Sequence, residues 1–147
     1  MPERSTTGIG HGFGRILVFV YGIFAFAATG RSSLQLATEA SRAPLPYTLS
    51  AFAAVVYVIA TFALATGRRS LALVTVGIEL VGVLVVGLTS ELFPADYHDK
   101  TVWSQFGAGY GYVPLVLPIA GLWWLLRGAA HTRVNWHPSP DRDPDDA

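Results

Sequence analysis

The sequence predicts an all-α polytopic membrane protein, a bundle of four transmembrane helices with both termini in the cytoplasm. Three observations support this fold class. Of the 147 residues, 52% are hydrophobic and only 14% are charged, and the mean hydropathy is +0.43. The apolar residues also form four blocks, which turn residues and charge clusters separate. This composition is typical of a chain that crosses a membrane several times.

The four apolar blocks predict spans over residues 13–31, 47–66, 70–89 and 110–127, within one membrane domain of residues 1–130. The second and third approach the ~20 residues that cross a hydrocarbon core. The first and fourth gain length from their flanks, and helix tilt absorbs the remainder. Arg4 and Arg15 precede the first block as in a signal peptide, but we expect a retained helix.

Basic residues near the span ends predict the orientation. Six lie on one side and three on the other, which favours cytoplasmic termini: Arg4, Arg15, Arg68, Arg69, Arg127 and Arg133 against Arg31, Arg42 and Lys100. The short connection "TGRRS" predicts an antiparallel hairpin of the second and third helices. The residues 131–147 are rich in Pro and Asp, so we expect a disordered cytoplasmic tail.

Two longer connections lie on the opposite side. The first, "GRSSLQLATEASRAPLP", reads as helical until Pro44, so helix one is expected to project beyond the membrane. The second, "SELFPADYHDKTVWSQFGAGYGY", mixes acids, aromatic residues and glycines and is the most irregular part of the chain. Pro114 and Pro118 follow it and weaken the start of helix four. Because loops carry function more often than spans do, this connection is a candidate site.

Glu79 is the only acidic residue in the apolar stretch "VGIELVGVLVV". A carboxylate at the centre of a transmembrane helix costs about 3 kcal/mol to insert, and twelve Leu, Ile and Val residues between Leu71 and Leu88 offset this cost. An ionisable residue at this depth is a candidate proton carrier, cation ligand or counter-ion. Glu79 is therefore the first candidate functional residue.

A structural role for Glu79 is the favoured alternative. No basic residue occupies the middle of a predicted span, so a neutral Glu79 that donates a hydrogen bond to a neighbouring helix is expected. Thr75 lies one turn earlier, and Tyr21 and Tyr57 lie at similar depth in helices one and two. A partner from another protein chain is a third interpretation.

Other motifs predict packing more than chemistry. Gly77, Gly82 and Gly87 recur every five residues, and small residues let helices approach closely. "GAGYGY" has GxGxG spacing without a preceding strand, so a dinucleotide loop is not expected. Trp123, Trp124 and Arg127 predict an interfacial anchor on the cytoplasmic side.

Metal and catalytic sites find little support. Asp96, His98 and Asp99 could be ligands, but exposed acidic loops are usually solvated and their spacing fits no strong template. The chain has no cysteine and no net charge, so neither a thiolate site nor a nucleic-acid partner is expected. We therefore expect no catalytic residues, metal or cofactor.

Four segments together carry a resemblance to small four-span integral membrane proteins of actinobacteria: "GRILVFVYGIFAFAATGRSSLQLATEA", "LPYTLSAFAAVVYVIATFALA", "GIELVGVLVVGLTS" and "TVWSQFGAGYGYVPLVLPIAGLWWLLR". The resemblance covers roughly Arg15 to Arg127. It implies a location in a bacterial plasma membrane. It transfers no catalytic residues, because that group carries no established activity.

Three hypotheses for function remain open. The first is a non-catalytic accessory or assembly subunit that packs against a larger membrane complex, whereas a homo-oligomer without other partners would favour the second. The second is a small oligomeric carrier or channel that uses Glu79 to bind a proton or cation. The third and weakest is a membrane enzyme acting on a lipid or quinone, with Asp96, His98 and Asp99 as its site.

Overall fold

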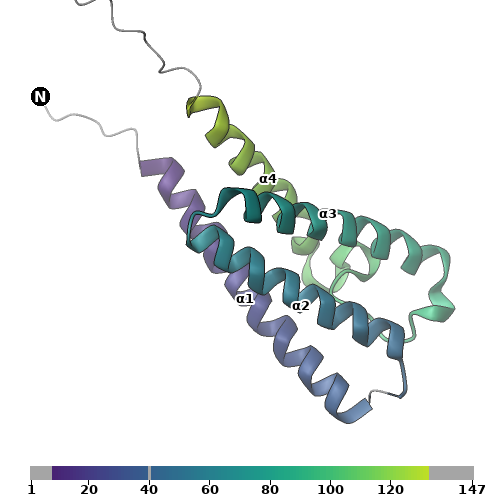
Figure 1. The fold of residues 1–147 in the computed structure, drawn as a ribbon. Coiled ribbons are helices and arrows are strands. Elements are labelled where there is room, and N and C mark those ends of the chain that lie inside the picture. Colours follow the sequence, from purple (N-terminus) through teal and green to yellow (C-terminus); the bar gives the residue numbers. More distant parts are fainter. Residues whose placement is uncertain (1–7, 40, 133–147) are drawn as a thin grey trace, which may run out of the picture.

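The computed structural model describes residues 8–39 and 41–132, and this part of the chain is helical apart from its turns and loops (Figure 1). Its elements, in chain order, are α1 (Gly8–Glu39), α2 (Pro44–Ala65), α3 (Arg69–Leu92), η1 (Pro94–Asp96), η2 (Ser104–Tyr110) and α4 (Val113–Thr132). Within the described ranges, α1, α2 and α3 are long and apolar enough to cross a membrane. The bent pair of η2 and α4 makes a fourth span if it is counted as one.

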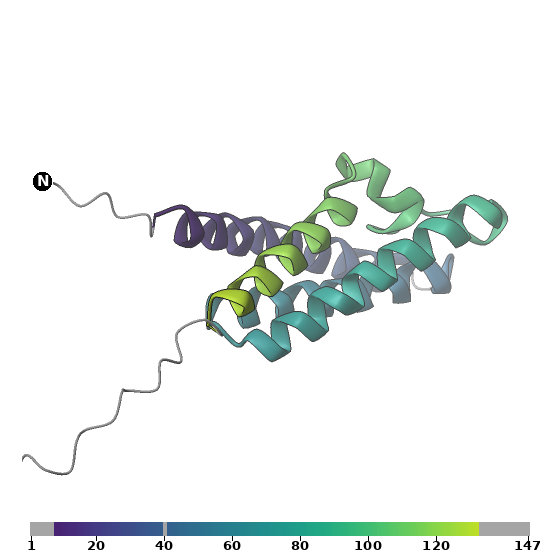
Figure 2. The same ribbon diagram turned by 90° about the horizontal axis from the view of Figure 1, so that it is seen from above.

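The bundle has two ends, which differ in what connects the helices. The terminal end holds the start of α1, the turn at residues 66–68 and the last turns of α4 (Figures 1 and 2). The loop end holds the α1–α2 connection and the start of the segment 93–112, which then turns back toward the middle of the bundle (Figure 1). Most of the tail expected to be disordered, residues 133–147, lies outside the described residues.

Helix α1 packs chiefly on α2. It has 32 residues, which gives a length of about 48 Å, and it continues past the predicted span to Glu39. Small buried side chains allow the close approach of the two helices, and Ala28, Ala53, Ala60 and Ala63 are each at most 2% exposed. Helix α2 begins at Pro44, where a missing N–H is tolerated.

A tight turn joins α2 to α3, as the sequence predicts. Gly67 adopts a φ of +67°, a left-handed conformation that costs glycine little. The Arg68 N–H donates to Ala63 O at 2.8 Å, which satisfies a carbonyl at the end of α2. The two helices therefore run antiparallel and in contact.

The segment 93–112 between α3 and α4 folds back onto the bundle and does not simply cap it. We call it the inserted segment. Gln105, Phe106 and Gly107 have φ values of 52°, 57° and 80°, and left-handed backbone is strained for the first two. Side-chain hydroxyls stabilise this backbone. Ser90 Oγ accepts the Gln105 N–H at 2.8 Å, and Thr101 Oγ1 accepts the Ser104 N–H at 3.0 Å.

Two glycines of α3 receive the aromatic side chains of this segment. A Cβ added at Gly82 would lie 2.6 Å from Trp103 Cζ3, and one added at Gly87 would lie 2.5 Å from Phe106 Cδ1. A Cβ added at Gly77 would meet nothing within 4 Å. The glycine pattern of α3 therefore serves the docking of a loop more than the packing of neighbouring helices.

Helix α4 begins three residues later than the sequence predicts. Gly111 and Tyr112 have φ values of 63° and 61°, so the chain cannot continue as one helix from residue 110. It bends by 101° between η2 and α4. Pro118 lies inside α4, and both Pro114 and Pro118 are fully buried. Helix α4 packs on α3 and η2 and makes little contact with α1.

Gly82→Ala is expected to destabilise the protein by about 1–3 kcal/mol, because the added methyl group overpacks a filled site. Gly77→Ala is the matched control on the same helix, with open space around the added Cβ, and should be close to neutral. Unfolding free energies from titration with sodium dodecyl sulfate in mild detergent would measure both. Equal effects of the two substitutions would contradict the role given to Gly82.

Candidate functional site

A cluster of polar and aromatic side chains lies in the centre of the bundle. Glu79 of α3 is fully buried, and the Tyr21 hydroxyl of α1 donates to its Oε2 atom at 2.6 Å. Tyr57 of α2 is also fully buried, with its ring centroid 6.2 Å from that of Tyr21. The structure thus brings together Glu79, Tyr21 and Tyr57, three of the four candidate residues.

Trp103 completes this arrangement from the segment between α3 and α4. It is 1% exposed, and its Nε1–H donates to Tyr57 Oη at 3.1 Å. Its ring also lies edge-on to Phe52 of α2, with 6.1 Å between centroids. We call Tyr21, Tyr57, Glu79 and Trp103 the core cluster. Its members come from α1, α2, α3 and the inserted segment, so it ties all of these elements together.

The fourth candidate, Thr75, has a different role. Its hydroxyl donates to Leu71 O within α3, at 2.9 Å. Such bonding to the preceding turn satisfies a hydroxyl inside a helix without a partner from another helix. Thr75 is therefore not part of the core cluster.

One carboxyl oxygen of Glu79 has no hydrogen-bond partner in the described residues, so the hydrogen bonding of the core cluster is incomplete. Oε1 is buried and accepts no hydrogen bond from the described residues, whereas Oε2 accepts one from Tyr21. No ion pair of Glu79 occurs in the described part of the chain, where Arg42 and Glu39 form the one salt bridge. The chemistry available here is hydrogen bonding and proton exchange at a single carboxyl group.

The three loop candidates do not converge on one site. Asp96 and His98 are exposed, while Asp99 is half-buried and accepts a hydrogen bond from Tyr47 Oη at 2.7 Å. Over residues 8–39 and 41–132, no group of three or more His, Cys, Asp or Glu side chains could hold a metal ion. The structure thus separates Asp99 from the other two.

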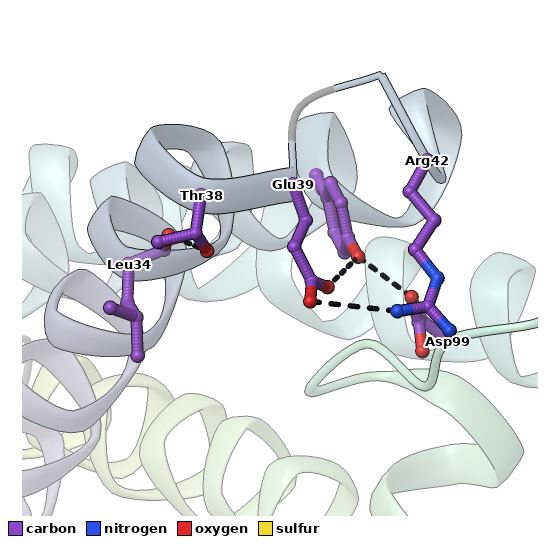
Figure 3. A network of polar contacts seen from close by, with 6 residues as sticks. Leu34, Thr38, Glu39, Arg42 and Asp99 are labelled. Atoms are coloured by element: carbon purple, nitrogen blue, oxygen red, sulfur yellow. Dashed lines mark hydrogen bonds and ion pairs between the residues drawn. The ribbon is translucent and has the colours of Figure 1, made fainter.

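Asp99 belongs to a polar network at the loop end (Figure 3). Tyr47 Oη lies 2.9 Å from Glu39 Oε2 as well as 2.7 Å from Asp99, and Arg42 Nη1 lies 3.5 Å from Glu39 Oε1. The phenol has one hydrogen, so it donates to one carboxyl group at a time while its oxygen lies within hydrogen-bond distance of both. The network joins the end of α1 to α2 and to the loop.

A second tie at the loop end comes from Arg31 of α1. Its Nη1 donates to Tyr110 Oη at 2.7 Å and its Nη2 to Lys100 O at 2.6 Å. Arg31 therefore fixes the inserted segment to α1 at two points, Lys100 and Tyr110. At the terminal end, Arg127 lies over the ring of Trp123, 4.1 Å from its centroid, and Trp124 packs against Gly14.

The sequence analysis missed Trp103, which is the fourth member of the core cluster. The available signal was the pairing of a loop rich in aromatic residues with two glycines on one helix. The aromatic loop and the glycines of the third helix are each visible in the sequence. Nothing in their spacing indicates that the loop inserts beside α3.

Comparison with protein-family models, curated proteins and solved structures found no match to this chain.

Glu79→Leu is expected to destabilise the protein by about 1–3 kcal/mol, because the buried Tyr21 hydroxyl loses its partner. Glu79→Gln retains an acceptor and should cost less. In a double-mutant cycle with Tyr21→Phe, the coupling energy should be about 0.6–1.7 kcal/mol, the range found for hydrogen bonds between membrane helices. Unfolding in mild detergent measures all four proteins. A coupling energy near zero would contradict a stabilising Tyr21–Glu79 bond.

Proposed function

We propose that this chain is a non-catalytic accessory subunit of a larger complex in a bacterial plasma membrane, anchored by four spans. In this proposal η2 and α4 form the fourth span, and the terminal end faces the cytoplasm. The distribution of charge supports this orientation. The described residues of the terminal end carry Arg15, Arg68, Arg69 and Arg127, against Arg31, Arg42 and Lys100 toward the loop end.

The observation that carries the proposal is a groove between α1 and α2, in the half of the bundle near the loop end. It has a volume of about 320 Å³ and is lined by Thr29, Ser32, Ser33, Leu36, Ala51, Ala54, Val55, Val58 and Ile59. Ser32 is 4% exposed, and its Oγ atom has no hydrogen-bond partner in the described residues. A buried hydroxyl without a partner is costly, and most such groups are satisfied.

A transmembrane helix of a partner fits this groove. Thr29 and Ser33 lie four residues apart on the exposed face of α1, and small residues at this spacing let a second helix approach closely. Hydroxyl groups there can also bond across the contact. Glu79 lies inside the bundle, so the proposed contact does not depend on it.

Ser33→Leu is expected to abolish partner binding, since the larger side chain would fill the groove. Ala27→Leu is the matched control, because Ala27 is exposed on α1 outside the groove. The tagged protein would be purified in mild detergent from its own host, and co-purifying proteins would be quantified by mass spectrometry. A partner present in stoichiometric amount with wild type and Ala27→Leu, and at least about tenfold depleted with Ser33→Leu, supports the proposal. Isolation of the chain alone from wild-type cells contradicts it.

The unpaired oxygen of Glu79 favours a second candidate function, an oligomeric proton- or cation-linked carrier. An ionisable residue buried in a span is a functional site by default, and Oε1 is available for a proton or ion. A single small bundle offers little room for a path, so this function calls for a homo-oligomer.

Glu79→Gln separates the two functions. In a carrier, this substitution removes the titrating group and should abolish proton flux into liposomes, measured with an enclosed pH-sensitive dye. In an accessory subunit, it should leave partner recovery unchanged. Unaltered flux in the Glu79→Gln protein would rule out the carrier function.

A further inference from the structure

A large cavity lies at the terminal end, away from the α1–α2 groove. Its volume is about 1100 Å³, and α1, the α2–α3 turn region and α4 contribute to its lining. Most of its walls are apolar, with Phe13, Val18, Leu64, Ala72, Trp124 and Leu125 among them. The cavity exists because α4 packs on α3 and makes little contact with α1.

Three arginines and no acidic residue line this apolar cavity. They are Arg15 of α1, Arg69 at the start of α3 and Arg127 of α4. Arg69 is half-buried and donates to Leu125 O at 2.6 Å, which fixes it at the wall. Arg127 is positioned by its stacking on Trp123. The described acidic residues lie in the core or toward the loop end, so these cations have no carboxylate near them in the described part of the chain.

We propose that this cavity binds an anionic glycerophospholipid. The phosphate would lie among Arg15, Arg69 and Arg127, and an acyl chain would occupy the apolar space between α1 and α4. Arginine matches the geometry of a phosphate group, and basic pockets between transmembrane helices are known to bind acidic head groups. The apolar walls require the acyl chain, which free phosphate lacks.

The position of the cavity along the helices agrees with this occupant. Trp123, Trp124 and Arg127 lie in the second half of α4, within six residues of Gly128, where the apolar span ends; tryptophan and arginine side chains meet lipid head groups at such span ends. An occupant with its charge at this level and its apolar part directed toward the middle of the bundle has the layout of a membrane lipid. A partner helix would bring no matching negative charge unless it carried acidic residues at this level.

The test is lipid retention by the full-length protein, measured by native mass spectrometry after delipidation and titration with phosphatidylglycerol or phosphatidylcholine. Phosphatidylglycerol should be retained preferentially. Arg15→Gln and Arg127→Gln should each weaken its binding about fivefold, the effect expected for one basic residue near an anionic lipid. Both side chains are exposed, so folding should be unaffected, and circular dichroism would verify this. Arg68→Gln is the matched control, because Arg68 lies at the same end outside the cavity.

A second variant tests the cavity without changing charge. Gly128 lines the cavity, and a Cβ added there meets nothing within 4 Å, so Gly128→Leu should fill the space and weaken retention of phosphatidylglycerol. Inorganic phosphate should not compete. Equal retention of the two lipids, or an equal loss with Arg68→Gln, would overturn the proposal. So would competition by inorganic phosphate, or a protein dimer that Gly128→Leu dissociates.

Discussion

The docking of Trp103 against α2 and α3 is the contact on which the rest of the structure depends. Polar groups at membrane depth must find partners inside the protein, and the Trp103 indole N–H finds one in Tyr57. Gly82 provides the space for the ring. Tyr57 in turn lies beside Tyr21, which bonds to Glu79. One aromatic side chain therefore joins a strained loop to three helices.

Much of this architecture follows from the sequence alone. Apolar block length predicts α1 to α3 within a few residues at most ends, and similar depth along the helices correctly suggests that Tyr21 and Tyr57 lie near Glu79. Helix α4 and the loop before it were predicted less well. The left-handed conformations of Gln105, Phe106 and Tyr112 are imposed by tertiary contacts, and local propensity opposes them. Likewise, Gly82 and Gly87 give the same pattern whether they face a helix or an inserted loop.

The two surface cavities proposed as binding sites differ in chemistry, and this difference supports separate occupants. The α1–α2 groove has hydroxyl groups and no charged side chain, whereas the cavity at the terminal end combines aromatic walls with three arginines. The cavity at the terminal end lies where α1 and α4 make little contact, whereas the groove lies between α1 and α2 alone. Within the described residues, helices that are neighbours in the chain pack on one another, α1 on α2, α2 on α3 and α3 on α4, and the inserted segment packs on α3 and α4.

The site that receives Trp103 also imposes an order on biosynthesis. Its walls come from α2 and α3, and Trp103 follows both in the chain. The ribosome therefore releases the two helices before the indole can dock, and until then the Tyr57 hydroxyl lacks its indole partner. Docking of Trp103 then locks the α2–α3 hairpin, and a chain interrupted before residue 103 would leave that hairpin without this contact.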